Sequence, residues 1–477
     1  MKTIPFKILK IFIFLGGLLN TVFGFESKHS GVPHFDGSVL SIYWVIPFIG
    51  ILLSIALFPL IFPKFWHHHF GKVSVFWAAG FIIPFLIKEG FTLTIYELVH
   101  VSLLEYIPFI ILLLALFTIS GGVRLTGSLV GKPIINLLII LTGTAFASWM
   151  GTTGAAMLLI RPLIRANADR EHKVHTIVFF IFLVANIGGS LTPLGDPPLF
   201  LGFLKGVDFF WTTFAMIKPM LVMVVCLLGI YYLLDSYFYN QEYPIPGSEE
   251  NHKIGLEGKY NLLLLLGVIL SVLMSGFWHP NLHFTVFYVD VELQNLARDF
   301  LLICLAVISW NMTSQTIREA NEYTWFPIIE VAKLFAGIFV TIIPAIAILK
   351  AGTHGALSSV VESVSHDGQP VNYMYFWLTG ILSSFLDNAP TYLVFFNTAG
   401  GDPITLMTAQ HNTLMAISTG AVFMGANTYI GNAPNFMVKS IAESSGVVMP
   451  SFFGYFIKYS LPILFPLYMI VTYIFFL

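Results

Sequence analysis

The sequence predicts an all-α polytopic membrane protein that is built from two inverted-topology repeats. Three observations predict this fold class: a strongly apolar composition, apolar runs that recur along the chain, and two short motifs that interrupt such runs at matching places. Of the 477 residues, 57% are hydrophobic and only 10% are charged, with a formal net charge of −2. This balance excludes an ordinary soluble domain. The chain also shows no basic patch, so nucleic acid is not an expected partner.

The N-terminal residues 1–24 form the first element. Three lysines precede an apolar core at residues 11–23, and a polar stretch follows. This pattern is typical of a secretory signal peptide, and an uncleaved first helix is the alternative. Both alternatives place the segment after Gly24 on the outer side of the membrane.

The rest of the chain contains apolar runs long enough to cross about 30 Å of hydrocarbon. Backbone groups in lipid must be bonded within their own segment, so these runs are expected to be helices. The first repeat is expected at residues 39–234, with apolar runs at Val39–Ile61, Val73–Ile87, Ile107–Ser120, Ile134–Ile160, Ile177–Phe203 and Phe210–Leu234. The second is expected at residues 260–477, with runs at Leu262–Met274, Phe300–Trp310, Ile328–Leu349, Tyr373–Phe396, Leu414–Val438 and Phe452–Leu477. Residues 235–259, rich in proline, glycine and charge, are expected to form an exposed cytoplasmic connector between the repeats.

Lysine and arginine in short loops predict the orientation of the spans. If the chain starts outside at Ser38, most of these residues lie inside only if Ile134–Ile160 enters from the cytoplasm and returns to it. That run is therefore expected to be a re-entrant helical hairpin. Tyr373–Phe396 must likewise leave and return on the outer side, so the two hairpins point in opposite directions. The pattern favours a multi-pass protein of the bacterial inner (plasma) membrane.

Two motifs carry the evidence for the repeat: "GSLTPLGDPPLFL" at residues 189–201 and "GANTYIGNAPNFM" at residues 425–437. They pair Gly195 with Gly431 and Asp196 with Asn432 at a constant separation along the chain. At nearly the same separation, "MGTTGAAMLL" in the first hairpin matches "FLDNAPTYLV" in the second. Repeats of opposite topology that each contain a broken helix are typical of secondary transporters, whose binding site lies near the midplane of the membrane.

The residues at the first break fit such a site. Gly195 permits a tight turn, Asp196 is a preferred N-cap, and Pro197 begins a helix without losing a bonded N–H. The freed backbone groups and helix ends can hold ions, and hard cations such as sodium favour oxygen ligands. A carboxylate in mid-membrane is costly and functional by default. The alternative for Asp196 and for Asp387 is a simple helix cap.

The side chains at the breaks and hairpin tips are the candidate ligands for sodium, protons or another substrate. They are Thr152, Thr153, Gly154, Thr192, Gly195, Asp196, Asp387, Asn388, Thr391, Asn427, Thr428, Gly431 and Asn432. Asn186, before the first break, is expected either to join the site or to satisfy a freed carbonyl. Glu105 and its approximate counterpart Glu330 are expected to be charges at helix starts, with an intramembrane proton relay as the alternative.

The stretches "GTTGAAMLLIRPLIRAN" and "LTPLGDPPLFLGF" resemble the ion transporter superfamily, in particular its citrate-transporter-like branch and the NhaD-type sodium/proton antiporters. The resemblance covers most of the chain from about Val39. It implies scaffold and transport domains, elevator-like motion, a homodimer, and two sites, each made by one hairpin tip and the adjacent broken helix. The first site would hold Thr152, Thr153, Gly154, Thr192, Gly195 and Asp196. The second would hold Asp387, Asn388, Thr391, Asn427, Thr428, Gly431 and Asn432.

The expected function is a secondary active transporter, namely a sodium/proton antiporter in which both cations compete for Asp387 and Asp196. The alternative is a sodium- or proton-coupled carrier of citrate or another organic anion. The Ser-Asn-Thr tips typical of dicarboxylate carriers are replaced here by Gly-Thr-Thr and Asp-Asn-Ala, which favours the antiporter. An enzyme is not expected, because no catalytic or phosphate-binding motif appears. The expected partners are the lipid bilayer, the transported sodium ions and protons, and a second copy of the chain, with no resident cofactor and no metal other than sodium.

Overall fold

The computed structural model describes residue 33 and residues 35–127, 129–242 and 255–477. The predicted signal peptide or first helix at residues 1–24 lies outside the described residues. Within them the chain is mostly helical, with three short antiparallel strand pairs. Nine helices of this part are long and apolar enough to cross a membrane, and the bent pair Phe326–Thr341 and Ile343–Lys350 passes the same test together. The protein is an integral multi-pass membrane protein, which confirms the prediction from composition.

The first half begins with the short turns η1 (Gly37–Val39) and η2 (Ile42–Val45). Its longer elements are α2 (Ile46–Ile61), α3 (Pro63–Glu89), α4 (Phe91–Val101), the π-helical segment η3 (Ser102–Tyr106), α5 (Ile107–Ser120), β1 (Arg124–Thr126), α6 (Pro133–Met150), α7 (Thr152–Ala166), α8 (Val174–Leu183), η4 (Ile187–Leu191), α9 (Pro197–Leu204) and α10 (Phe209–Tyr239). The elements α4, η3 and α5 form one continuous helix. One glycine, Gly151, joins α6 to α7, and the start of α6 lies beside the end of α7, where the Asn136 Nδ2 atom donates to Asn167 Oδ1 at 2.8 Å. The predicted first helical hairpin is therefore present.

The second half follows a similar order. Its elements are β2 (Gly255–Glu257), α11 (Tyr260–Phe277), β3 (His283–Val286), β4 (Val289–Glu292), α12 (Leu293–Met312), α13 (Gln315–Ala320), α14 (Phe326–Thr341), α15 (Ile343–Lys350), η5 (Gly352–His354), α16 (Ser358–Ser363), β5 (Ser365–His366), β6 (Gln369–Pro370), α17 (Asn372–Phe385), α18 (Asn388–Thr398), α19 (Pro403–Met407), α20 (His411–Met424), η6 (Gly425–Asn427), α21 (Ala433–Ser444), α22 (Phe452–Tyr455), the π-helical η7 (Phe456–Leu464) and α23 (Phe465–Phe475). The helices α17 and α18 form the second hairpin, in which the Tyr375 and Phe395 rings lie 6.3 Å apart.

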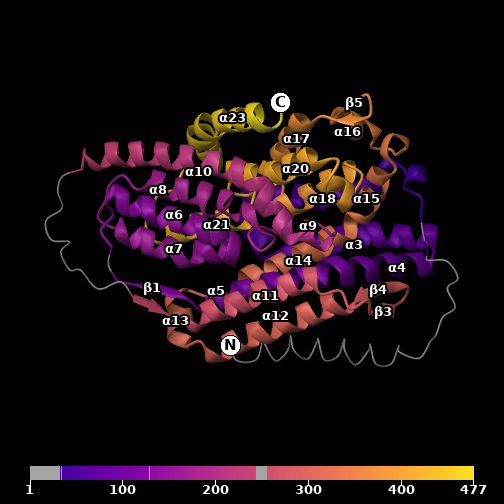
Figure 1. The fold of residues 1–477 in the computed structure, drawn as a ribbon, viewed down its shortest axis with the longest axis horizontal. Coiled ribbons are helices and arrows are strands. Elements are labelled where there is room, and N and C mark those ends of the chain that lie inside the picture. Colours follow the sequence, from indigo (N-terminus) through magenta and orange to yellow (C-terminus); the bar gives the residue numbers. More distant parts are fainter. Residues whose placement is uncertain (1–32, 34, 128, 243–254) are drawn as a thin grey trace.

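The helices form two groups that run roughly parallel to the long axis of the molecule (Figure 1). One group contains α5, α11, α12 and α14, of which α12 packs against both α5 and α11. The other contains the two hairpins and the broken helices α8–α9 and α20–α21. The strands β3 and β4 lie at one end of the molecule, and β1 with α13 lies at the opposite end.

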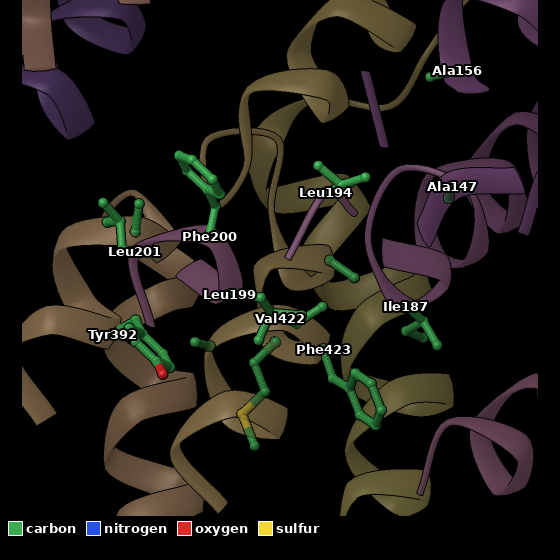
Figure 2. Close-up of a cluster of buried hydrophobic side chains, with 14 of the residues drawn as sticks. Ala147, Ala156, Ile187, Leu194, Leu199, Phe200, Leu201, Tyr392, Val422 and Phe423 are labelled. Carbon is green, nitrogen blue, oxygen red and sulfur yellow. The ribbon is translucent and has the colours of Figure 1, made fainter. Parts of the chain in front are cut away.

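The broken helices lie at the centre of the fold. In the window Val174–Leu191, 89% of the residues are buried, against 22% in α3. Figure 2 shows how apolar side chains of both halves, among them Leu194, Phe200, Tyr392 and Phe423, gather around the first break. A helix that is apolar all round is typically buried, and α8 is of this kind. This explains why the predicted site lies inside a dense core and not on a lipid-facing surface.

Two predicted boundaries are wrong. Helix α3 begins at Pro63 and not at Val73, since its polar first turns contact protein: the His67 ring stacks on Phe326 at 4.7 Å. Helix α10 continues to Tyr239, so the predicted connector starts too early. Residues 243–254 of that connector lie outside the described residues, and residues 255–257 pair with β1.

Candidate ion-binding site

The first break separates α8 from α9 by the helical turn η4 and a further turn at residues 192–196. The Thr192 hydroxyl donates to the backbone carbonyl of Ser148 in α6. The Thr152 N–H, which begins α7, donates to Gly195 O at 2.9 Å. The first hairpin tip and the first break are therefore bonded to each other, as predicted.

The second break repeats this geometry. Thr428 donates to Ser384 O at 2.5 Å, as Thr192 does to Ser148. The backbone angles agree as well: φ and ψ are −143° and 143° at Asp196 and −152° and 139° at Asn432. The motifs that align in the sequence thus adopt one local structure.

Glycine is required at both breaks. A Cβ atom on Gly195 would lie 2.1 Å from the Gly189 carbonyl oxygen, and one on Gly431 would lie 2.5 Å from Gly425 O. Both obstacles are backbone atoms, which cannot rotate away as a side chain can.

We expect Gly195→Ala to destabilise the folded protein by about 1–3 kcal/mol, the usual cost of overpacking a dense core. The measurement is the melting temperature of the purified protein in detergent together with the monodisperse fraction after extraction. Gly229→Ala in α10 is the matched control, because a Cβ there meets nothing within 4 Å. Equal melting temperatures for the two variants would contradict the required close approach at the first break.

Asp196 connects the two halves of the protein. The carboxylate accepts hydrogen bonds from Thr152 Oγ1 at 3.2 Å, Asn388 Nδ2 at 2.5 Å and Asn432 Nδ2 at 2.9 Å. Asp196 is the N-cap of α9, yet its side chain makes no capping bond. The helix-cap alternative therefore fails for Asp196, whose side chain is instead directed at the tips of both hairpins and at the second break.

Asp387 differs from Asp196. It is half-buried and its side chain caps α18, accepting from the Ala389 N–H at 3.1 Å. Thr391 donates to the backbone oxygen of Asp387 at 3.0 Å and fixes the same turn. Asp387 therefore does cap α18, and it also lines a cavity with Asp196.

This cavity, the site cavity, has a volume of about 110 Å³. Seven of the predicted ligands line it: Thr152, Thr153, Gly154, Gly195, Asp196, Asp387 and Asn432. The residues that α5 and α14 contribute to its lining are apolar and include Phe109 and Phe335. The structure thus places residues of both expected sites around a single cavity, whereas the resemblance implied two separate sites.

The other predicted residues do not line the site cavity. Thr192 and Thr428 bond the hairpin backbones, and Gly431 and Thr391 shape the turns. Asn427 donates to Ser384 Oγ at 2.8 Å and does not line the cavity. Asn388 reaches the site through its bond to Asp196.

Two further amides complete the network. Asn186 donates to Ile181 O at 2.8 Å, so it does satisfy a carbonyl that the break has freed, and also to Asn435 Oδ1 at 2.7 Å. Asn435 in turn donates to Gly425 O and Thr428 O. Sequence reasoning missed Asn435, and the one available signal was an amide just after the second break, within the motif at residues 425–437.

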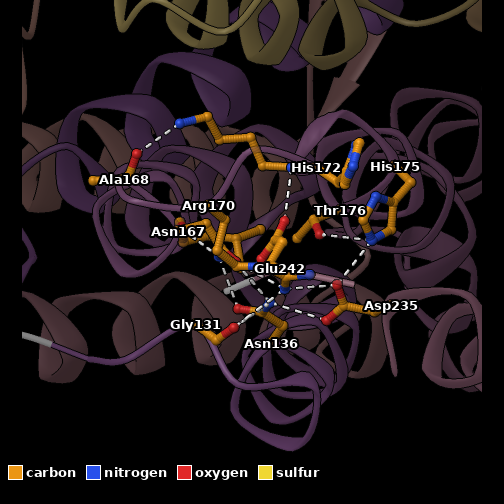
Figure 3. Close-up of polar contacts among 12 residues, drawn as sticks. Gly131, Asn136, Asn167, Ala168, Arg170, His172, His175, Thr176, Asp235 and Glu242 are labelled. Carbon is orange, nitrogen blue, oxygen red and sulfur yellow. Dashed lines mark hydrogen bonds and ion pairs between the residues drawn. The ribbon is translucent and has the colours of Figure 1, made fainter. Parts of the chain in front are cut away.

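A second buried polar cluster, also missed, lies at the base of the first hairpin (Figure 3). Its centre is Asp235, which is 0% exposed and pairs with Arg170 at 2.7 Å and His175 at 2.8 Å. Asn136 and Tyr231 donate to the other carboxylate oxygen of Asp235 at 3.1 and 3.0 Å. The prediction of an exposed connector from residue 235 is therefore wrong at its first residue, because these partners hold Asp235 inside the fold.

Comparison with known proteins shows which family the chain belongs to. The sequence profile of the family described as "Putative citrate transport" matches residues 37–476. The chain belongs to this family. It is similar to an "uncharacterized transporter" of Mycobacterium tuberculosis, with 25% identity over 364 residues that cover 71% of this chain and 78% of the relative. It is also similar to a "46 kDa membrane protein" of Mycobacterium leprae, with 24% identity over 332 residues that cover 66% and 71% of the two chains. The predicted resemblance to citrate-transporter-like proteins is confirmed at the level of this transporter family.

Proposed function

We propose that this member of the family is a secondary active transporter that exchanges sodium ions for protons by alternating access. The observation that carries the proposal is the position of Asp196. It is 2% exposed, lies at the break of a central helix, and is held by side chains of both halves. A buried carboxylate is costly unless a proton or a cation neutralises it. Asp196 is therefore suited to hold one or the other.

The oxygen atoms around Asp196 support sodium as the cation. Because an ionised carboxylate only accepts hydrogen bonds, Asn388 presents its amide nitrogen to Asp196. The Asn388 Oδ1 atom is then left buried, with no hydrogen-bond partner among the described residues. A buried carbonyl oxygen without a donor is a ready ligand for a hard cation. Asp387 and Thr152, which line the site cavity with Asp196, supply further oxygens.

Exchange follows if the transport domain moves only when Asp196 is neutral. The cavity that Asp196 lines has an apolar wall that contains Phe109, Leu112 and Phe335. Carrying an unpaired charge past this wall would be far more costly than carrying a protonated or sodium-bound carboxylate. The duplicated breaks and the two hairpins support the further proposal that the halves are inverted repeats, that the hairpins are re-entrant, and that both move against a scaffold containing α5 and α14.

The second candidate is a sodium- or proton-coupled carrier of citrate or another organic anion. The family description favours it. So do four helix N-termini, those of α7, α9, α18 and α21, which begin beside the site and favour negative charge. Two observations support the antiporter instead. None of the described residues that line the site cavity is lysine, arginine or histidine, and about 110 Å³ is small beside the roughly 300–1,000 Å³ of usual small-molecule pockets.

The test uses purified protein in proteoliposomes with a pH-sensitive dye inside. An inward sodium gradient is expected to drive protons out, without citrate or succinate present. Uptake of labelled citrate that needs a sodium or proton gradient, with no proton movement from sodium alone, would overturn the antiporter and establish the anion carrier. The bacterial inner membrane as the location, and a homodimer as the assembly, remain predictions.

We expect Asn388→Ala to weaken the apparent sodium affinity about tenfold, since a hydrogen bond to a charged group contributes roughly 1.5–3 kcal/mol. The measurement is the sodium concentration that gives half-maximal proton movement. Asn397→Ala is the matched control on the same helix, because among the described residues the Asn397 side chain donates only to its own helix backbone, at Leu393 O. An unchanged sodium dependence in Asn388→Ala would remove Asn388 from the cation site.

A further inference from the structure

A second cavity, the vestibule, is lined by acidic, basic and histidine side chains that the transport site does not use. Its volume is about 640 Å³, and these side chains are Asp36, Glu97, His100, Glu105, Lys205 and Lys350. Three of these residues belong to the continuous apolar helix Phe91–Ser120. Ionisable residues in such a helix are rare and are functional by default. We therefore expect these residues to have a function.

The vestibule and the site cavity lie at opposite ends of the same two helical stretches. Residues 96–105 line the vestibule and residues 109–117 line the site cavity. Likewise, α14 lines the site cavity, whereas residues 342–351 at and after its end line the vestibule. By the predicted orientation, the vestibule faces the outer side of the membrane.

Buried aromatic rings separate the two cavities. The Phe109 ring lies 4.8 Å from Phe335 and 5.8 Å from Phe339, and Tyr106 lies 6.2 Å from Phe339. Phe109 and Phe339 are 0% and 1% exposed. We infer from this ring packing that the site cavity is closed toward the vestibule in this state.

One ion pair joins the helix Phe91–Ser120 to the C-terminal end of α9 beside these rings. Glu105 Oε1 lies 2.5 Å from Lys205 Nζ, and the other Glu105 oxygen is buried without a partner among the described residues. Glu105 was expected at the start of a helix, but it lies inside a continuous helix, on the π-helical segment η3. Such π-helical turns occur frequently at functional sites.

Lys205 is linked directly to the ion site. The eight-residue helix α9 has Asp196 as its N-cap and Lys205 as its C-cap. At about 1.5 Å per residue, such a helix is a rod of roughly 12 Å between the two. A displacement of Asp196 toward the vestibule therefore moves Lys205 relative to Glu105.

We propose that the Glu105–Lys205 ion pair is the gate that closes the transport path on the vestibule side, and that it must open before Asp196 can face that side. The gate rests on the proposed transport function, because a path that alternates needs a closure on each side. With the pair broken, the state that is open to the vestibule becomes more populated.

The test measures access from the outer side without any substrate. Val331, which lines the site cavity, is replaced by cysteine in a background where Cys226 and Cys304 are alanine. A membrane-impermeant maleimide is then added to right-side-out vesicles. Glu105→Gln is expected to raise the labelling rate roughly five- to tenfold, a typical range for a coupling between sites. Lys205→Gln removes the other partner of the same ion pair and is expected to have the same effect. It serves as the second variant if Glu105→Gln folds poorly, because the Lys205 side chain is 22% exposed and that of Glu105 is 5% exposed.

Two comparisons make the gate falsifiable. The exchanged pair, Glu105→Lys with Lys205→Glu, is expected to restore slow labelling. Glu97→Gln, in the same vestibule but outside the ion pair, is expected to leave the rate unchanged. Unchanged labelling in both single variants, fast labelling in the exchanged pair, or an equal rise in Glu97→Gln would each overturn the gate.

The same vesicles separate failure of the gate from failure of the proposed function. If sodium drives no proton movement in the unmodified protein but the labelling responds as expected, the gate stands and the transported species is another one. If exchange is intact and the labelling does not respond, the gate is wrong and the antiporter stands.

Discussion

Replacement of Asp196 by asparagine is expected to abolish sodium-driven proton movement in proteoliposomes. Asparagine keeps the size of the side chain but can neither release a proton nor neutralise a cation. Because Asp196 makes no capping bond and its neighbours are neutral amides and a hydroxyl, the variant is expected to fold. The loss should therefore appear as a rate close to that of empty liposomes, with an unchanged melting temperature.

Two variants make this result specific. Asp367→Asn is the matched control, since Asp367 is 90% exposed and has a positive φ of 51° that asparagine also tolerates. It should transport at the normal rate. Asp387→Asn keeps a good N-cap, so we expect reduced but measurable exchange. Full activity in Asp196→Asn with loss in Asp387→Asn would transfer the coupling role from Asp196 to Asp387.

Replacement of Asp235 by alanine is expected to cause a large loss of stability. The carboxylate has four partners at the base of the first hairpin: Arg170, His175, Asn136 and Tyr231. When it is removed, the one ion-pair partner that Arg170 keeps among the described residues is Glu242, at 3.0 Å. Breaking a buried ion pair by deleting one partner costs about 3–5 kcal/mol, because the other charge stays buried. The cluster joins α6, α8 and α10, so its loss should loosen the hairpin that carries Thr152.

The measurement is the melting temperature of Asp235→Ala in detergent, with Asp367→Ala as the exposed control. We expect the control to change the free energy of unfolding by no more than about 0.5 kcal/mol. A melting temperature of Asp235→Ala equal to that of the control would show that the buried pair contributes no net stability.

Sequence reasoning located the helices and both breaks well, because lipid and backbone chemistry leave few options there. Apolar runs must be helices, and Gly195 with Pro197 can only mark an interruption. Gly431 and Pro434 repeat that signal, and the structure gives both breaks the same backbone conformation. The motif residues were therefore predictable from local rules.

Long-range pairing was not predictable in this way. Nothing local to residue 235 shows that Arg170 and His175 lie beside it, so its charge was taken as a loop charge. The bonds from Asn388 and Asn432 to Asp196 cross from one half to the other, whereas the family resemblance implies two separate sites. The polar start of α3 was missed for a related reason, since contacts such as His67 on Phe326 stabilise it.

The central claim is that sodium and a proton compete for one buried carboxylate. The most direct measurement is equilibrium binding of radioactive sodium to the purified protein over a range of pH, with Asp196→Asn beside it. We expect saturable binding that weakens by about tenfold per pH unit once the solution is acidic enough to protonate the site, the slope for one competing proton. Asp196→Asn should bind no sodium. Sodium binding that is independent of pH, that survives in Asp196→Asn, or that appears only when citrate is present would contradict the claim.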